Sequence, residues 1–442
     1  MHGGRLFARY LSEQLGNLGQ MKDAARALLQ ENTETVEYEG RVWRYSVPST
    51  NSYPHQWLWD SGFHAITWSL CDPARGCDEL RSLFRWQWPD GFIPHVVFWH
   101  PERVNERGWH YLESAGIWSF LPNRKPRTTA LTQPPVLATA VERLVLAGAE
   151  DFLSEALPVL ERYYRYLASQ RDPDQDGLIS TIVQFETGLD FSPAYDRALR
   201  AGPHDARKIL VRSRLVEIKN KFAGYDLARI FARNDHAEDM LVNAIWIDNL
   251  KALARLARRG EQPELATWAE AKASQALQSL LERAWDPQRG LFFNLVGSGE
   301  IRAEAKTIQC LLPLLLEDLP DDVTERLLAH LTDRREFWSP YPVPSVALDE
   351  PSYSDDSHLH GLRLIWRGPC SMNTNWFLYQ GLLRHGEAGY ASQLAQRSRE
   401  LVESGGFNEF YDARSGRPVG ASRFGWATLV ADMSATAESP PP

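Results

Sequence analysis

The sequence contains few cysteines and no long hydrophobic run. Its 442 residues include only four cysteines, at spacings that match neither a disulfide framework nor a zinc ribbon, so we expect ordinary thiols. The longest apolar runs, such as 310–316, are less than half of the ~20 residues that cross a membrane, which excludes a transmembrane helix. The first residues show scattered charge and no apolar core followed by a small-residue cleavage site. We therefore expect a cytoplasmic protein.

An excess of positive charge is also missing. Lysine and arginine total 48 against 57 acidic residues, and the net charge of −9 argues against a nucleic-acid partner. The glycines of a phosphate-binding loop are absent, because Gly297 and Gly299 are not followed by the remaining glycine and lysine. No Gly-x-Ser-x-Gly elbow of a serine hydrolase occurs.

Helical periodicity dominates the chain, and period-two strand signals are few and short. Apolar residues recur three and four positions apart in seven segments: 136–146, 152–169, 239–258, 263–285, 323–331, 373–383 and 390–403. Division of the length into about twelve helix-plus-loop units gives roughly 37 residues each, which fits six helical hairpins closed into a ring. We therefore predict an all-α, (α/α)6 toroid forming one catalytic domain over residues 1–433, with long rim loops at 101–135 and 333–369. We expect residues 434–442 to be a disordered tail.

Aromatic residues are abundant and cluster with polar partners. Tryptophan, tyrosine and phenylalanine make up 11% of the chain, and flat aromatic faces flanked by hydrogen-bonding groups suit sugar rings. In segment 53–64, Asp60 could accept sugar hydroxyl hydrogens while Trp57 or Trp59 stacks on the ring. The equally weighted alternative is that Asp60 caps a helix beside core tryptophans.

Two further segments place acids among aromatic residues. In segment 185–193, Asp190 lies between Leu and Phe, where burial would keep it protonated; it fits that role better than Glu186, although a loop-capping Asp is the alternative. In segment 405–412, Glu409 could activate a water, although a surface acid is the more common fate of a glutamate. Together, the acids and the aromatic platform meet the requirements of glycosidic bond hydrolysis.

Segment 355–360 contains metal-capable side chains. Asp355, Asp356, His358 and His360 are close in sequence, but no spacing supplies further ligands, so we predict no metal and no cofactor. The same two histidines are the close pair that a rival function, sugar epimerisation or isomerisation, would need.

Several ordered motifs resemble one known family. They are the Tyr-Pro-x-Gln-Trp-x-Trp-Asp block at 53–60, Gly-Phe-Ile-Pro-His at 91–95, Thr-Gln-Pro-Pro at 132–135, Glu-Thr-Gly-Leu-Asp-Phe-Ser-Pro at 186–193, Val-Asn-Ala-Ile at 242–245, Trp-Arg-Gly-Pro at 366–369 and Phe-Asn-Glu-Phe-Tyr at 407–411. The chain thus resembles the bacterial mannosylglycerate and glucosylglycerate hydrolases of glycoside hydrolase family 63, which are similar to the family 37 trehalases. This resemblance implies the toroid and an inverting mechanism.

The resemblance also implies roles for individual residues. It makes Asp190 the acid and Glu409 the base. It places the sugar-binding residues at Tyr53, Trp57, Trp59, Asp60, Gln133, Gly188 and Trp366, with His95 and Arg367 close by. The chain departs from the family where Ser371 replaces a common tryptophan, which predicts one missing stacking wall. Phe185 and Phe191 replace the usual Trp and Asn of the acid loop.

The expected substrate is a small α-linked sugar conjugate, and mannosylglycerate or glucosylglycerate is favoured. A trehalase-like or glucosidase-like hydrolase is the alternative, and an epimerase or a non-catalytic sugar-binding protein is less favoured. An anionic aglycone needs a cation, for which Arg207, Lys208, Arg212 and Arg423 are candidates. We expect segment 415–423 and loop 101–135 to close over substrate. A homo-oligomer is left open.

Overall fold

The computed structural model describes residues 19–100, 127–355, 358–359, 362–436, and the fold is reported for these residues. It is rich in helices, as the periodicity predicts. A helical stretch at 19–31 precedes the labelled elements. The helices are α2 (Leu58–Ser69), α3 (Pro73–Phe84), α5 (Leu137–Leu146), α6 (Asp151–Gln170), α7 (Ala206–Phe222), α8 (Leu227–Phe231), α9 (Met240–Arg259), α10 (Pro263–Ser279), α11 (Asp321–Thr332), α12 (Met372–Arg384), α13 (Ala388–Gly405) and α14 (Val430–Thr436). Shorter helical turns are η1 (Gln184–Thr187), η2 (Pro193–Tyr195), η3 (Leu280–Ala284), η4 (Ile308–Cys310), η5 (Leu312–Leu315) and η6 (Gly425–Leu429).

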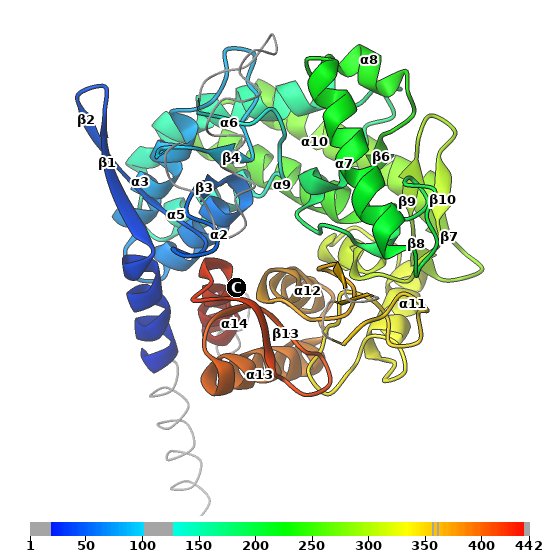
Figure 1. Ribbon diagram of the computed structural model, residues 1–442. Coiled ribbons are helices and arrows are strands. Elements are labelled where there is room, and N and C mark those ends of the chain that lie inside the picture. The colour runs from blue at the N-terminus through cyan, green and yellow to red at the C-terminus, as the bar shows by residue number, and fades with distance from the viewer. Residues whose placement is uncertain (1–18, 101–126, 356–357, 360–361, 437–442) are drawn as a thin grey trace, which may run out of the picture.

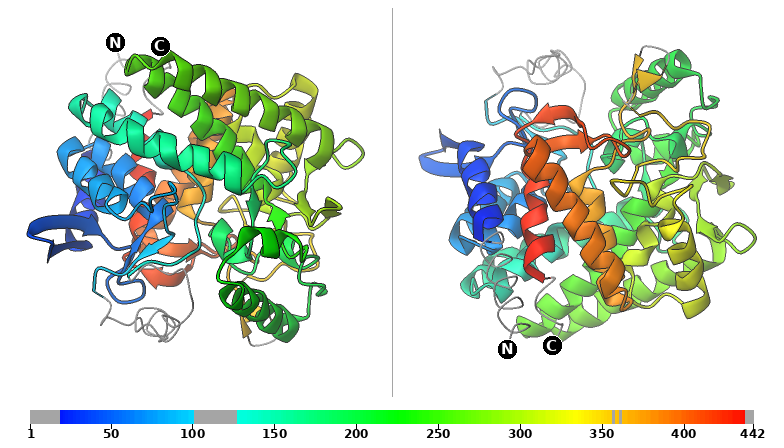
Figure 2. Two further views of the ribbon diagram at one scale, coloured as in Figure 1. Left: turned by 90° about the horizontal axis from the view of Figure 1, so that it is seen from above. Right: turned by 90° about the horizontal axis from the view of Figure 1, so that it is seen from below.

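The helices are arranged around a centre (Figure 1). Helix α2 packs against α3, α5 against α6, α9 against α10 and α12 against α13. A second set of contacts joins one pair to the next: α2 contacts α5, α5 contacts α9, α9 contacts η5, η5 contacts α12, α12 contacts η6, and η6 contacts α2. The C-terminal elements therefore return to the first helix pair. Figure 2 shows α6 and α10 on the face seen from above and α13 on the face seen from below.

Burial distinguishes the two members of each pair. Eleven residues of α2, from Leu58 to Trp68, are buried, and α9 and α12 are buried over most of their length. Helices α6, α10 and α13 instead bury one stripe of residues and expose the opposite face. Helix α9 begins at Asp239, whose carboxylate accepts hydrogen bonds from the backbone N–H groups of Leu241 and Val242 at 3.0 and 3.1 Å.

Short strands are present, so the all-α description is too simple. They are β1 (Thr33–Tyr38), β2 (Arg41–Ser46), β3 (Gln56–Trp57), β4 (Val96–Val97), β5 (Ser180–Thr181), β6 (Ala237–Glu238), β7 (Trp285–Asp286), β8 (Leu291–Phe292), β9 (Asn294–Val296), β10 (Ile301–Ala303), β11 (His358–Leu359), β12 (Leu362–Arg363), β13 (Asn408–Tyr411) and β14 (Pro418–Ser422). One sheet has four strands in the order β10-β9-β6-β5, and the others have two. The strands lie in the connections between helices. There the backbone N–H and C=O groups are satisfied by hydrogen bonds to a neighbouring strand.

All seven predicted helical segments are helices in the structure, with ends shifted by a few residues. Helix α14 extends to Thr436, which is inside the segment expected to be a disordered tail; the residues after it lie outside the described part of the chain. Within the described residues, no helix combines the length and the apolar composition needed to span a membrane. The four cysteines are free thiols.

Candidate active site

The acid-bearing loop is held by Glu186, which follows β5 in the turn η1. Both Glu186 oxygens accept hydrogen bonds from the guanidinium of Arg171, each at 2.7 Å. They also accept from the backbone N–H groups of Ile182 and Thr132 at 2.9 and 3.1 Å. Because its acceptor sites are occupied by buried donors, Glu186 anchors the loop and leaves Asp190 as the loop acid with capacity for chemistry.

Asp190 lies in an environment that favours its protonated form. Burial raises the pKa of Asp190 to about 7; Arg214 lowers it, and the charges of Glu409 and Glu217 raise it further. The side chain is enclosed by protein but still half-buried, so it keeps a surface that a ligand can reach. The backbone beyond it is fixed, because the N–H of Phe191 donates to Oε1 of Gln184 at 2.8 Å.

Glu409 lies on β13, at an irregularity in its pairing with β14. Its side chain is 3% exposed. Oε1 accepts a hydrogen bond from the hydroxyl of Tyr53 at 2.8 Å, and Oε2 accepts one from the N–H of Ala421 at 2.9 Å. Gly420 makes this approach possible, since a Cβ there would lie 2.6 Å from Oε2 of Glu409. Two donors to a carboxylate fix its orientation.

Ser371 has a supporting role that the sequence analysis missed. Its hydroxyl donates to the backbone carbonyl of Glu409 at 2.8 Å, and the indole of Trp426 donates to the same carbonyl at 3.3 Å. The residue that replaces a stacking tryptophan in this chain therefore helps to position the strand that carries Glu409.

Asp60 completes a group of three carboxyls. It lies on α2, is 2% exposed, and its Oδ1 has no hydrogen-bond partner among the described residues. Burial raises the pKa of Asp60 well above its usual range. The negative charges of Glu409 and Glu79 also raise it. The helix begins after Trp57 with no side-chain cap, so the alternative that Asp60 is an N-cap is wrong. The charge of Glu409 thus raises the pKa of both Asp190 and Asp60.

The predicted aromatic platform divides into two layers. Tyr53 and Trp57 are half-buried and meet edge to face, with ring centroids 5.8 Å apart. Trp59 and Trp366 are each 1% exposed and both contact the ring of Trp426. Tyr53 and Trp57 therefore keep an exposed ring surface that a ligand can contact, whereas Trp59 and Trp366 are buried and support the site.

The remaining predicted site residues have partners within the protein. Oε1 of Gln133 accepts from the N–H of Trp59 at 3.2 Å, and Nδ1 of His95 lies 2.6 Å from the hydroxyl of Thr129. Arg367 is fully buried and forms an ion pair with both carboxylate oxygens of Asp196. Gly188 (φ +71°) lies against the ring of Trp59.

The four cations proposed for an anionic aglycone are located elsewhere or are occupied. Arg212 donates to the carbonyls of Leu199 and Arg200 at 2.8 and 3.2 Å. Lys208 lies 3.8 Å from Asp205, Arg423 pairs with Glu31, and Arg207 is exposed.

Among the described residues, Arg214 on helix α7 is the cation whose charge acts on Asp190. Its guanidinium stacks over the ring of Phe185 at 4.7 Å from the centroid and donates to Glu217 at 2.9 Å. The sequence offered one signal for it: Ser213, Glu217 and Asn220 form the buried stripe of α7, and Arg214 borders that stripe.

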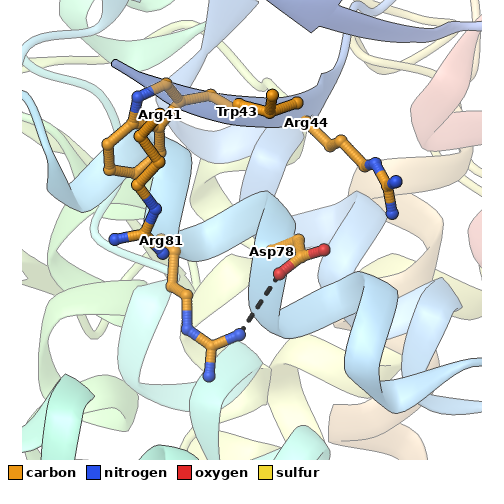
Figure 3. A pocket seen from close by; sticks show the side chains of 6 residues that line it. Arg41, Trp43, Arg44, Asp78 and Arg81 are labelled. Atoms are coloured by element: carbon orange, nitrogen blue, oxygen red, sulfur yellow. Dashed lines mark hydrogen bonds and ion pairs between the residues drawn. The ribbon is translucent and has the colours of Figure 1, made fainter. Parts of the chain in front are cut away.

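The predicted closing segments and the metal-capable residues are the last of the expected features. Segment 415–423 contains β14 and forms a hairpin with β13. Residues 101–126 of the predicted closing loop and the side chains of His358 and His360 lie outside the described part. Asp355 is exposed and pairs with Arg414 at 3.2 Å. A small basic pocket between the β1–β2 hairpin and α3 contains no predicted site residue; there Arg81 pairs with Asp78 at 3.2 Å (Figure 3).

A helix-rich fold in which burial raises the pKa of one acid and hydrogen-bond donors hold a second is typical of glycoside hydrolases. A family model described as the mannosylglycerate hydrolase MGH1-like glycoside hydrolase domain matches residues 53–427. The chain belongs to this family of glycoside hydrolases.

Known relatives agree with that membership. A mannosylglycerate hydrolase from Thermus thermophilus is 31% identical, covering 88% of this chain and 95% of the relative. A glucosylglycerate hydrolase from Mycolicibacterium hassiacum is 28% identical, covering 86% and 91%. The crystal structure of a GH63 mannosylglycerate hydrolase from Thermus thermophilus in complex with glucose matches with a TM-score of 0.78 and 28% identity, covering 94% of this chain and 100% of that one.

Proposed function

We propose that this chain is an inverting α-glycoside hydrolase in which Asp190 is the general acid and Glu409 the general base. The observation that carries the proposal is the contrast between the two carboxyls. Burial raises the pKa of Asp190 to about 7, whereas Glu409 accepts hydrogen bonds on both oxygens. Asp190 would protonate the departing glycosidic oxygen while Glu409 takes a proton from the water that attacks the opposite face of the sugar.

Asp60, Trp57 and Tyr53 would hold the sugar beside these acids. The Oδ1 of Asp60, which has no partner in the described part of the chain, can accept a hydrogen bond from a sugar hydroxyl, and the half-buried rings of Tyr53 and Trp57 offer an apolar face. Trp59, Gly188, Gln133, Trp366, His95 and Arg367 would act as positioning residues, since each contacts protein groups behind or beside this layer.

The substrate would be mannosylglycerate or glucosylglycerate, the compounds for which the relatives are named. Both have a carboxylate in the leaving group. The leaving group departs on the side of the acid, and Arg214 is the cation whose charge acts on Asp190. A guanidinium at that place could pair with the glycerate carboxylate, which would otherwise be costly to bury.

The fold would be a closed (α/α)6 ring forming one catalytic domain. The succession of contacts from α2 through α5, α9, η5, α12 and η6 back to α2 supports closure. Such a ring would bring the connections that contain β3, η1 and β13 together at one site. Asp60 follows β3, Asp190 follows η1, and Glu409 lies on β13.

The test is to incubate the purified protein with mannosylglycerate, glucosylglycerate, trehalose and short α-glucosides and to follow product anomers by NMR. We expect the β-anomer of the sugar to appear first from one of the two glycerate conjugates. Initial release of the α-anomer would contradict inversion, and a rearranged sugar without a second product would contradict hydrolysis.

A further inference from the structure

Helix α7 exposes a line of apolar side chains. Seven large hydrophobic residues are exposed in the described part of the chain, and four of them, Val211, Leu215, Ile218 and Phe222, belong to this one helix. Val211 is 57% exposed and Phe222 is 70% exposed. In both views of Figure 2, α7 (green) lies at the outer edge of the molecule. Single exposed apolar residues are normal on a protein surface, but a group of them on one element indicates an interaction site.

The exposed line is not needed to hold α7 in place. The opposite side of the helix is buried, and there the side chain of Gln184 donates to the hydroxyl of Ser213, while the amide of Asn220 donates to the carbonyl of Ile182 at 2.9 Å. None of the four exposed side chains belongs to a hydrophobic cluster of the described residues. Helix α7 is therefore anchored by one face and presents a second apolar face outward.

The spacing of the four residues is that of a helix–helix seam. They follow one another at separations of four, three and four positions. With 3.6 residues per turn, they lie within an arc of about 60° on the helix surface. A stripe that faces a protein core is wider, roughly 100° or more, whereas a narrow seam with alternating separations of three and four is what one helix presents to another in a coiled coil. Val211, Leu215, Ile218 and Phe222 are called the α7 seam below.

Cations border the α7 seam on both sides. The helix contains six basic residues and one acid, Glu217, which is buried. Arg207 borders one edge of the seam, and Lys208 and Lys219 border the other; all three are exposed. Charges beside a seam of this kind determine which partner fits. The α7 seam therefore favours a facing helix with acidic residues beside its own apolar positions.

A second copy of the chain fits the α7 seam poorly. Two α7 helices placed seam to seam would bring the bordering cations of one copy against those of the other, and like charges in contact are costly. Four side chains are also far fewer than the roughly 20–30 residues that each partner of a stable dimer contributes. Both the charge and the size of the seam therefore indicate a smaller, acidic partner.

We propose that the α7 seam binds an amphipathic helix of another protein, with apolar residues at the same spacing and acidic residues beside them. The apolar anchors would supply most of the contact, and the acids would pair with Arg207, Lys208 and Lys219. Docking at this face is independent of the catalytic roles of Asp190 and Glu409, because the α7 seam lies on the exposed side of the helix.

A pair of synthetic helices can test the seam on the full chain. Each would contain about three heptads with Leu at the seam positions, and one would carry Glu and the other Lys at the flanking positions. Both repel copies of themselves, so each is monomeric. We expect saturable binding of the Glu helix in fluorescence anisotropy, weakened by salt, and binding of the Lys helix at least about tenfold weaker. Failure of the Glu helix to bind, or equal binding of the two helices, would overturn the proposal.

Variants at exposed positions locate the binding without disturbing the core. The double change Leu215→Ser with Ile218→Ser should weaken binding of the Glu helix at least about tenfold at an unchanged Tm. Lys208→Glu with Lys219→Glu should reverse the preference toward the Lys helix. Leu146→Ser is the matched control, because Leu146 is 67% exposed but lies on α5, and it should bind as the wild type does. Equal affinity in the seam variant and the control would contradict the assignment.

The other occupants of such a face give different results. A concentration-dependent dimer in light scattering that the Leu215→Ser, Ile218→Ser variant loses would assign the face to a second copy. Sedimentation with phosphatidylglycerol vesicles, lost in the same variant and without binding of the Glu helix, would assign it to a membrane surface. Either result would overturn the proposal of a partner helix.

Discussion

Gly188 lies directly against the indole ring of Trp59. A Cβ at position 188 would be 2.3 Å from Cζ2 of that ring, and the backbone has a φ of +71°. The contact joins the acid-bearing loop to helix α2, so that the residue two positions before Asp190 rests on a fixed aromatic surface. The glycine is thus required for a close approach and for its backbone conformation.

Replacement of Gly188 by alanine should therefore displace the acid. We expect Gly188→Ala to reduce kcat by about 100-fold, as misplacement by about 1 Å can, and to cost about 1–3 kcal/mol of stability. Gly386→Ala is the control, because Gly386 has a similar φ of +76° but nothing within 4 Å of its added Cβ. It should cost about 1–2 kcal/mol and leave kcat unchanged. Equal losses of kcat in both variants would show that backbone strain, and not the Trp59 contact, matters.

The two proposed catalytic carboxyls should be required for turnover but not for folding. We expect Asp190→Asn and Glu409→Gln each to lower kcat by at least about 100-fold, the range of general acid and base catalysis. Circular dichroism and the binding of the free sugar should change little. The exposed Glu264 provides a control, and Glu264→Gln should retain full activity. Appreciable turnover in both active-site variants would eliminate the assignment.

The sequence predicts helices well where they have one buried face. All seven periodic segments are helices, but α3 and α7 were not predicted, and of α2 only a helix start near Asp60 was considered. Helix α2 is buried on all sides, so its apolar and polar residues show no period, and α7 exposes apolar residues such as Phe222 besides its buried stripe. The short strands were missed because two-residue pairings leave no alternation to detect.

Candidate site residues could be selected from the sequence where the neighbouring residue types were informative. They could not be selected where the answer depends on the direction in which a side chain points in the fold. Asp190 was preferred to Glu186 from the sequence because its neighbours Leu189 and Phe191 are apolar, whereas in the structure Glu186 is the more buried of the two acids. Which of Trp57 and Trp59 keeps an exposed face depends on the packing of Trp426, more than 360 residues away along the chain. The choice of Arg214 over Arg212 depends in the same way on which side of α7 meets the acid loop.

The raised pKa of Asp190 predicts how activity depends on pH. The general acid must be protonated, and with a pKa of about 7 it loses its proton as the pH rises through that value. We expect kcat/KM to be level on the acid side of about pH 7 for as long as the general base stays ionised, and to fall about tenfold per unit above pH 7. A pH–rate profile on the hydrolysed substrate checks this, and full activity two units above neutrality would contradict it.

The same group predicts how stability depends on pH. Its pKa is raised in the folded protein from an ordinary value of 3.8, so between 3.8 and about 7 the folded state binds more protons than the unfolded state. Asp190 therefore makes the protein less stable as the pH rises through this window, and the loss persists above it. Asp190→Asn should melt above the wild type at about pH 8 and approach it near pH 4. A Tm difference that is the same at both pH values would contradict this account.

Arg214 should determine the preference for an anionic leaving group. Replacement by glutamine removes the cation beside Asp190, so a glycerate conjugate loses a charge-assisted pairing that a neutral glycerol conjugate never made. We expect Arg214→Gln to raise KM about tenfold or more for the glycerate conjugate and to leave KM for the glycerol conjugate nearly unchanged.

Arg212→Gln is the control for this experiment, because Arg212 is on the same helix but donates to the carbonyls of Leu199 and Arg200. It should lower stability and leave the ratio of the two KM values as in the wild type. The change of Arg214 also removes the charge that lowers the pKa of Asp190, so the fall in activity should move to higher pH for both substrates. A shift in the pH profile without a change in the KM ratio would mean that Arg214 acts on the acid and that another cation binds the aglycone.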